Sequence, residues 1–232
     1  MSGFFIGPEA SSQDYAALRE RMVAEVEAMY AETRGETGIG AMSSAVRAAL
    51  GRVERHRLVP PAQAPVAYRN HPLPIGAGQT ISQPYIVALC ADLLNPKADD
   101  VVLEVGTGSG YQAAVLAEIV KQVHSVELIG SLGTAASARL AEMGYRNVEV
   151  RIADGYAGWP EKAPFDGIVV TAAAPQVPPA LVAQLKTGAR MVIPVGGSDD
   201  IQYLKLLVKR PDGGYDEKRV LPVRFVPLVP VK

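Results

Sequence analysis

From Asp100 onward the sequence alternates between short apolar runs typical of strands and longer segments with helical spacing. The run DVVLEV, for example, is separated from the run QVHSVEL by YQAAVLAEIV, which predicts a helix. This alternation constrains the fold more than any other feature, because strand–helix–strand units produce parallel strands with helices on the faces of the sheet. We therefore predict an α/β fold with a mostly parallel, doubly wound sheet.

The C-terminal part of this region follows a different pattern. QYLKLLVKR and KRVLPVRFVPL both predict strands, and the segment between them, RPDGGYDE, has the residues of a hairpin turn. A hairpin joins antiparallel strands. We therefore predict at least one antiparallel strand at the C-terminal edge of the sheet.

The N-terminal part is predicted to be helical and then irregular. Apolar spacing in SSQDYAALRERMVAEVEAMY predicts a helix from Ser11 to about Tyr30, and a second helix begins near Ser43 after a loop, RGETGIGAM. The proline-rich passage LVPPAQAPVAYRNHPLPIGAG follows, and we expect an ordered but irregular connection there because proline lacks an N–H donor. We predict that residues 1–75 pack as one segment on a core domain of residues 76–232.

Composition excludes several classes of protein. The chain has 232 residues, 48% of them hydrophobic, and a formal net charge of -1, so bulk attraction to nucleic acid or to an anionic membrane is not expected. Cys90 is the only cysteine and lies in an apolar run, which favours a buried structural thiol. The first residues, MSGFFIGPEA, lack the pattern of a secretory signal, and we predict a cytoplasmic protein.

A glycine-rich turn lies where a ligand is expected. In an open α/β sheet the first turn from strand to helix usually contacts the ligand. Here that turn is LEVGTGSGY, with Gly106, Gly108 and Gly110 alternating with small hydroxyl residues. Acids also lie at the ends of successive predicted strands, at Glu104, Glu127 and Asp154. Three acids at one edge of a sheet indicate a binding site more strongly than the glycines do alone.

Two classes of cofactor are compatible with a turn of this kind. A dinucleotide site has the pattern G-x-G-x-x-G, whereas this turn is G-x-G-x-G followed by the bulky Tyr111. The tighter pattern favours S-adenosylmethionine, whose ammonium group Glu104 could receive. Glu127 could accept hydrogen bonds from both ribose hydroxyls, but it would serve NAD equally well.

Segments on both sides of this turn resemble the protein-L-isoaspartate O-methyltransferase family. The similar segments are LPIGAGQTISQPYIVALCADLL, VLEVGTGSGYQAAVLA, the long stretch from DGYAGWPEKAPFDG to ARMVIPVG, and the tail VRFVPLV. The resemblance covers roughly Val53 to the C-terminus. It implies a Rossmann-like methyltransferase domain that uses S-adenosylmethionine, releases S-adenosylhomocysteine, and methylates the free α-carboxylate of L-isoaspartyl residues in damaged proteins.

The resemblance also implies roles for individual residues. Ser82 matches the residue taken as the active-site serine, and Val226 in the tail matches a backbone contact to the substrate peptide. The cofactor would be bound by Gln79, Thr80, Ile81, Glu104, Gly106, Thr107, Gly108, Gly110, Glu127, Asp154 and Gly155. The resemblance implies no metal site.

Some segments depart from the family pattern. The first fifty or so residues follow it poorly, and Leu58-Val59-Pro60 stands where many relatives have Phe-Val-Pro. The alternatives are a methyltransferase of the same fold with another acceptor, a cofactor-binding protein without turnover, and an NAD dehydrogenase. We expect isoaspartyl proteins and peptides as partners, and a monomer or a weak homo-oligomer.

Overall fold

The computed structural model describes residues 14–197 and 200–230. Its α-helices are α1 (Tyr15–Glu32), α2 (Arg34–Thr37), α3 (Ser44–Arg52), α4 (Pro84–Leu94), α5 (Tyr111–Ala117), α6 (Gly130–Glu142) and α7 (Pro179–Ala183). Short 3-10 helices span Arg55–Leu58, Pro61–Val66 and Pro160–Lys162. The strands are β1 (Leu73–Gly76), β2 (Gln79–Ile81), β3 (Val101–Val105), β4 (Gln122–Glu127), β5 (Val148–Ile152), β6 (Phe165–Val170), β7 (Leu185–Val195), β8 (Gln202–Lys209) and β9 (Tyr215–Val223).

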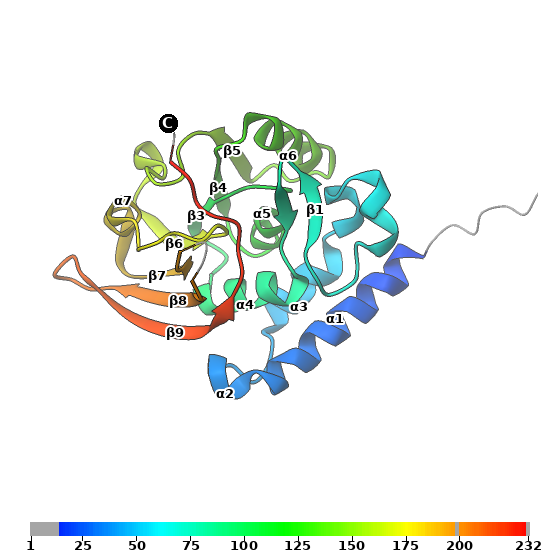
Figure 1. Cartoon of the computed structure of the whole chain (residues 1–232), viewed down its shortest axis with the longest axis horizontal. Coiled ribbons are helices and arrows are strands. Elements are labelled where there is room, and N and C mark those ends of the chain that lie inside the picture. The colour runs from blue at the N-terminus through cyan, green and yellow to red at the C-terminus, as the bar shows by residue number, and fades with distance from the viewer. Residues whose placement is uncertain (1–13, 198–199, 231–232) are drawn as a thin grey trace, which may run out of the picture.

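The central sheet has seven strands in the order β5-β4-β3-β6-β7-β8-β9. The neighbours from β5 to β7 pair in parallel, whereas β8 pairs antiparallel with β7 and with β9. The chain runs outward from β3 to β5 and then returns to add β6 on the other side of β3 (Figure 1). This reversal creates a switch point between β3 and β6, where doubly wound sheets bind their ligands. The predicted fold class is confirmed, including the antiparallel strands at the C-terminal edge.

Alternate residues of the central strands enter two hydrophobic clusters, one on each face of the sheet. Val102, Val169 and Val192 pack into the cluster that also contains buried residues of α1, α3, α4 and α5. Leu103 and Ile168 pack on the opposite face, with α7 and Trp159. This period of two places every second side chain of a strand on the same face. Trp159 is only 6% exposed in the second cluster, and Cys90 is buried as predicted.

The N-terminal helices pack on the cluster beneath α4. Asp14 caps α1, because its carboxylate accepts hydrogen bonds from the N–H groups of Ala16 and Ala17 at 3.1 and 3.0 Å. The predicted start of this helix at Ser11 lies outside the described residues. So do residues 1–10, in which we predicted no secretory signal. We predicted a loop for RGETGIGAM, and this prediction is wrong for its first residues. They form the short helix α2, which ends at Gly38, where φ is +78°.

The structure differs from the sequence prediction in one other place. β1, at the end of the proline-rich passage, and β2, directly after it, form a separate two-stranded antiparallel sheet, which we did not predict. β7 begins at Leu185, which pairs with Phe165 ahead of an irregularity in the β6–β7 register. No helix in the described ranges is long and apolar enough to span a membrane.

Candidate active site

The glycine turn leaves β3 at the switch point and leads directly into α5. Gly106 and Gly110 have φ values of +98° and +89°, a region that side chains with a Cβ rarely adopt. Gly110 is the N-cap of α5, so the turn ends where the helix exposes its free N–H groups. A Cβ on Gly106 would collide with the hydroxyl of Thr171. Glycine at position 106 therefore allows the end of β3 to lie close to the end of β6.

Glu127, at the end of β4, supports this turn. One carboxylate oxygen accepts a hydrogen bond from the N–H of Gly108 at 2.8 Å, and the other accepts one from the N–H of Ile129 at 2.9 Å. The residue is 7% exposed. Each carboxylate oxygen can accept a second hydrogen bond. Glu127 can therefore hold the turn and still accept hydrogen bonds from a ligand.

Glu104 is fully buried near the end of β3. Ser125 donates a hydrogen bond to Glu104 Oε2, and the Ser125 and Thr107 hydroxyls are 2.6 Å apart. Among the described residues, no side chain or backbone group makes a hydrogen bond to Glu104 Oε1. The pKa of the Glu104 carboxyl is raised to about 8, chiefly by burial and also by the negative charge of Glu127, while the hydrogen bond from Ser125 and the backbone N–H of Ala113 oppose the shift. A buried acid with one unpartnered oxygen is suited to receive a cationic group.

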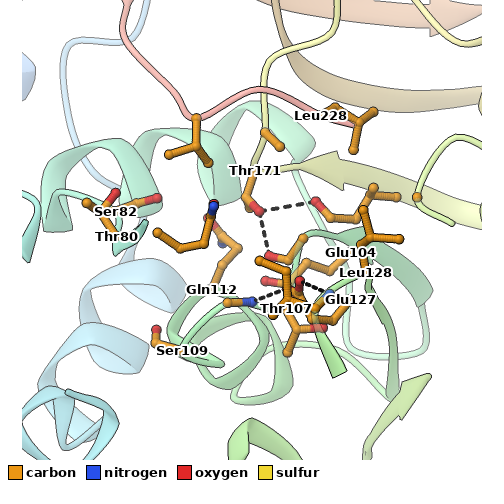
Figure 2. Close-up of a pocket in the computed structure, with 18 of the residues that line it drawn as sticks. Thr80, Ser82, Glu104, Thr107, Ser109, Gln112, Glu127, Leu128, Thr171 and Leu228 are labelled. Atoms are coloured by element: carbon orange, nitrogen blue, oxygen red, sulfur yellow. Dashed lines mark hydrogen bonds between the residues drawn. The ribbon is translucent and has the colours of Figure 1, made fainter. Parts of the chain in front are cut away.

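A pocket opens at this edge of the sheet, and Figure 2 shows Thr80 and Ser82 on one side of it, with Glu127 and Leu128 on the other. Most of the predicted site residues line it: Gln79, Thr80, Ile81, Ser82, Glu104, Gly106, Thr107, Gly108, Glu127, Gly155 and Val226. The structure does not bring Gly110 and Asp154 to its wall. Gly110 caps α5, and Asp154 Oδ1 accepts a hydrogen bond from the N–H of Tyr156 at 2.8 Å.

A second, more apolar groove adjoins this pocket. Its walls include Met29 of α1, Thr33 directly after α1, Tyr85 of α4 and the segment from Leu221 to Val226. Four residues line both spaces: Thr80, Ser82, Thr171 and Val226. Ser82 therefore lies at the junction between the pocket at the glycine turn and a groove open to a larger molecule.

The C-terminal segment closes one side of both spaces. After β9 the chain crosses back over the ends of the central strands (Figure 1). The N–H of Ala173 donates to the carbonyl oxygen of Val226 at 2.8 Å, and the N–H of Leu228 donates to the carbonyl oxygen of Ala173 at 2.7 Å. The tail is thus attached to the segment that follows β6, which fixes the position of Val226 beside Ser82.

Several residues of the pocket had no role in the sequence analysis. Gln112, Leu128 and Leu228 line it, and Thr171 donates to the carbonyl oxygens of Val105 at 3.1 Å and Gly106 at 2.6 Å. Thr171 directly follows β6, at the same edge of the sheet as the other pocket residues. Its contact with Gly106 depends on the pairing of β3 with β6, which no local pattern indicates.

No histidine occurs among the residues that line the pocket, and the described residues contain no cluster of acids, histidines and cysteines that could hold a metal ion. His71 is exposed, and its Nδ1 lies 2.9 Å from the carbonyl oxygen of Pro72. His124 is buried in β4, with its Nδ1 3.2 Å from Glu149 Oε2. The polar groups that this site offers are therefore carboxylates, hydroxyls, amides and backbone groups.

The strand order and the pocket at the switch point define a doubly wound α/β protein whose glycine turn lines a pocket at the carboxyl edge of the sheet, where proteins of this class bind their ligands. The family model for protein-L-isoaspartate(D-aspartate) O-methyltransferase matches residues 26–232. The chain therefore belongs to the protein-L-isoaspartate(D-aspartate) O-methyltransferase family.

Individual relatives are similar over most of their length. A protein-L-isoaspartate O-methyltransferase 1 from Nitrosospira multiformis is 56% identical over 218 residues, which cover 94% of this chain and 89% of the relative. A protein-L-isoaspartate O-methyltransferase 2 from Polaromonas sp. is 55% identical over 207 residues, which cover 89% of this chain and 98% of the relative.

Solved structures agree with the fold. One protein-L-isoaspartate O-methyltransferase aligns with a TM-score of 0.77 and 26% identity, over 90% of this chain and 65% of that chain. A Plasmodium falciparum structure described as a protein-L-isoaspartate O-methyltransferase in complex with S-adenosyl-L-homocysteine aligns with a TM-score of 0.73 and 22% identity, over 94% of this chain and 99% of that chain.

Proposed function

We propose that this enzyme transfers the methyl group of S-adenosylmethionine to the free α-carboxylate of L-isoaspartyl residues in damaged proteins. The resulting methyl ester collapses to a succinimide, which can reopen as normal aspartate. The observation that carries this proposal is the position of Ser82, at the junction between the pocket at the glycine turn and the open groove. A methyl donor in the pocket and a peptide in the groove would meet there.

The residues of the pocket fit this cofactor better than they fit a dinucleotide. Glu104 and Glu127 line the pocket, and its described lining contains no lysine, arginine or histidine that would neutralise a pyrophosphate. Two acids suit a ligand that carries an ammonium group and a ribose. We infer that Glu104 faces the ammonium group and that Glu127 accepts hydrogen bonds from the ribose hydroxyls.

The remaining site residues would position the cofactor and the acceptor. We infer that Thr80, Ile81 and Gln79 lie against the methionine end, and that Asp154 and Gly155 approach the adenine. A Cβ on Gly155 would lie 2.7 Å from Val105 Cγ1 and 3.0 Å from Leu228 Cδ1, so glycine keeps this wall close to the tail. The backbone of Val226 would bind the substrate peptide.

The reaction needs alignment more than proton transfer. When bound, S-adenosylmethionine supplies a methyl group on a sulfonium, so attack by the carboxylate forms a C–O bond as the C–S bond breaks. An α-carboxyl has a pKa of about 3.3–3.7, so the acceptor is already anionic at neutral pH and no general base is required. The Ser82 hydroxyl would donate a hydrogen bond that orients this carboxylate.

A single assay separates this function from its alternatives. The enzyme is incubated with methyl-labelled S-adenosylmethionine and either an isoaspartyl peptide or its aspartyl counterpart. We expect label on the isoaspartyl peptide alone. Label on another acceptor would indicate a methyltransferase of different specificity, and tight cofactor binding without transfer would indicate a binding protein. Binding of NAD in place of S-adenosylmethionine by calorimetry would indicate a dehydrogenase.

We also propose a cytoplasmic location and a monomeric or weakly self-associating state. The near-neutral charge of the chain supports the first proposal, and the amphipathic spacing of the first helix supports the second. Cell fractionation tests the first proposal. Sedimentation velocity over a hundredfold range of concentration tests the second, and a dimer that persists at the lowest concentration would contradict it.

A further inference from the structure

The buried acid of the pocket belongs to a short chain of hydrogen-bonding side chains. Glu104 is 0% exposed and ends in the wall of the pocket, where Ser125 and Thr107 connect it to the glycine turn. Among the described residues, the Ser125 hydroxyl is its only side-chain hydrogen-bond donor, and Glu104 Oε1 has no partner. A buried carboxylate normally has several donors or a paired cation, because burial without them is costly. An ionised Glu104 would have no paired cation in the described part of the chain, and only the Ser125 hydroxyl and the backbone N–H of Ala113 would favour its charge.

The groups that face Glu104 do not supply the missing charge. Glu127, from β4, adds a negative charge. Tyr111, from α5, is neutral because burial raises the pKa of its phenol to about 12. Arg55 lies against this ring, with its guanidinium carbon 4.5 Å from the ring centroid, but it does not line the pocket. From β6 and the tail, Thr171 and the segment 226–229 contribute no charged side chain.

We propose that Glu104 is a protonated acid in the empty pocket and gives up this proton when the ammonium group of the cofactor enters. Binding would form an N–H⁺···O⁻ hydrogen bond to the carboxylate, and the proton would leave to solvent. Cofactor binding is thereby coupled to the release of one proton. This inference rests on the proposed function, because it requires a ligand with an α-ammonium group. The raised pKa of Glu104, about 8, agrees with the geometry.

The coupling has a measurable sign. A ligand that binds only the ionised form binds more tightly as pH rises, up to the pKa of the acid in the empty protein. We therefore expect the association constant for S-adenosylhomocysteine to rise by up to about tenfold per pH unit between pH 6 and pH 7 and to level off above about pH 8. At pH 7 about nine-tenths of a proton is released per ligand bound.

Calorimetry on the full chain tests this directly. S-adenosylhomocysteine is titrated at pH 7 in two buffers with different ionisation enthalpies, and the difference in binding enthalpy gives the protons released. 5′-Methylthioadenosine, which lacks the amino-acid portion, is titrated in the same way. We expect release with the first ligand and none with the second. Equal release with both ligands, or none with either, would overturn the inference.

Three variants identify the group that loses the proton. Glu104→Gln should bind S-adenosylhomocysteine without proton release, whereas Glu25→Gln, an exposed position on α1, should release as much as wild type. If Glu104→Gln still releases a proton on binding S-adenosylhomocysteine, the proton comes from another group, such as the amine of the ligand. Ser125→Ala removes a hydrogen bond that lowers the pKa of Glu104. The pH at which the affinity levels off should therefore be higher in this variant than in wild type. If Ser125 contributes only to packing, this pH will not change.

The possible failures can be told apart. If no adenosyl ligand binds to the wild-type protein, the proposed function fails. If S-adenosylhomocysteine binds with an affinity that does not depend on pH between 6 and 8, the proposed function stands and this inference fails. If Glu104→Gln does not fold, the comparison of the two ligands and the Ser125→Ala titration still decide the question.

Discussion

The hydroxyl of Thr171, just after β6, donates a hydrogen bond to the carbonyl oxygen of Gly106 at 2.6 Å, in the glycine turn that follows β3. The two residues lie 65 positions apart in the sequence and meet because their strands are neighbours. The same hydroxyl also reaches the carbonyl oxygen of Val105 at 3.1 Å. One side chain thus attaches the cofactor turn to the next strand.

Replacing Thr171 by valine should loosen this turn without changing the volume of the side chain. Loss of a partly buried hydrogen bond costs about 1 kcal/mol or more, so we expect the Kd for S-adenosylhomocysteine to rise about tenfold. Thr171→Ser, which keeps the hydroxyl, is the matched control and should bind within about threefold of wild type. Isothermal titration measures both, and a valine variant that binds like wild type would contradict the role of this bond.

Ser82→Ala should separate catalysis from cofactor binding. If Ser82 only orients the acceptor carboxylate, its loss removes one hydrogen bond at the reacting group and lowers kcat about tenfold. The Kd for S-adenosylhomocysteine should stay unchanged. Steady-state kinetics with an isoaspartyl peptide, together with cofactor titration, tests both statements. Unchanged turnover would exclude the assignment.

Arg55 should contribute strongly to stability although it lies outside the site. Its guanidinium is buried against the ring of Tyr111 and donates to the carbonyl oxygens of Ala67 at 2.8 Å and His71 at 3.3 Å. Arg55→Met leaves both carbonyls without this donor, so we expect a loss of about 2–4 kcal/mol in the free energy of unfolding.

The control for that variant is Arg57→Met. Arg57 is exposed and pairs with Glu54 at 3.0 Å, an interaction worth less than about 0.5 kcal/mol. Urea unfolding monitored by circular dichroism compares the two variants with wild type. Equal effects would show that the burial of Arg55 is not what stabilises this region.

Glu104 also predicts how stability depends on pH. Its pKa is raised from 4.5 to about 8, so the folded protein keeps a proton that the unfolded chain loses near pH 4.5. Folding therefore becomes less favourable as pH rises from about 5 to about 8, because the folded state binds more protons. Glu104→Gln removes this contribution. The thermal midpoint of the variant, relative to that of wild type, should therefore rise as pH increases from about 5 to about 8. A difference between the two midpoints that does not change with pH would argue against a raised pKa.

The sequence predicted the central architecture well because that part of the chain depends on local periodicity. The apolar runs of β3, β4 and β6 became buried strands, whereas β5 at the edge of the sheet is only partly buried. The glycine turn adopted the positive φ values that its glycines permit. The residues of the site were named through motifs, and most of them line one pocket. Their individual roles, and the division of the chain at residue 75, stay predictions.

What the sequence did not predict depends on pairing between distant segments. The sequence did not indicate the β1–β2 ribbon, because prolines disfavour strands and because its turn, with positive φ at Gly76, Ala77 and Gly78, has no common hairpin pattern. Pro74 is tolerated in β1 because a two-stranded ribbon has an unpaired side. The contact between Arg55 and Tyr111 joins residues in different elements, and neither carries a local signal for the other.

The separate ribbon has a consequence for how this enzyme could change its acceptor. Thr80 and Ser82 are held by β2 and the residues after it, and Val226 by the tail, whereas Glu104 and Glu127 belong to the central strands. The ribbon, the tail and the central sheet therefore all contribute walls to the pocket. Exchanging the ribbon and the tail between related enzymes should alter which peptides are accepted, while the proposed contacts of Glu104 and Glu127 with the donor are kept.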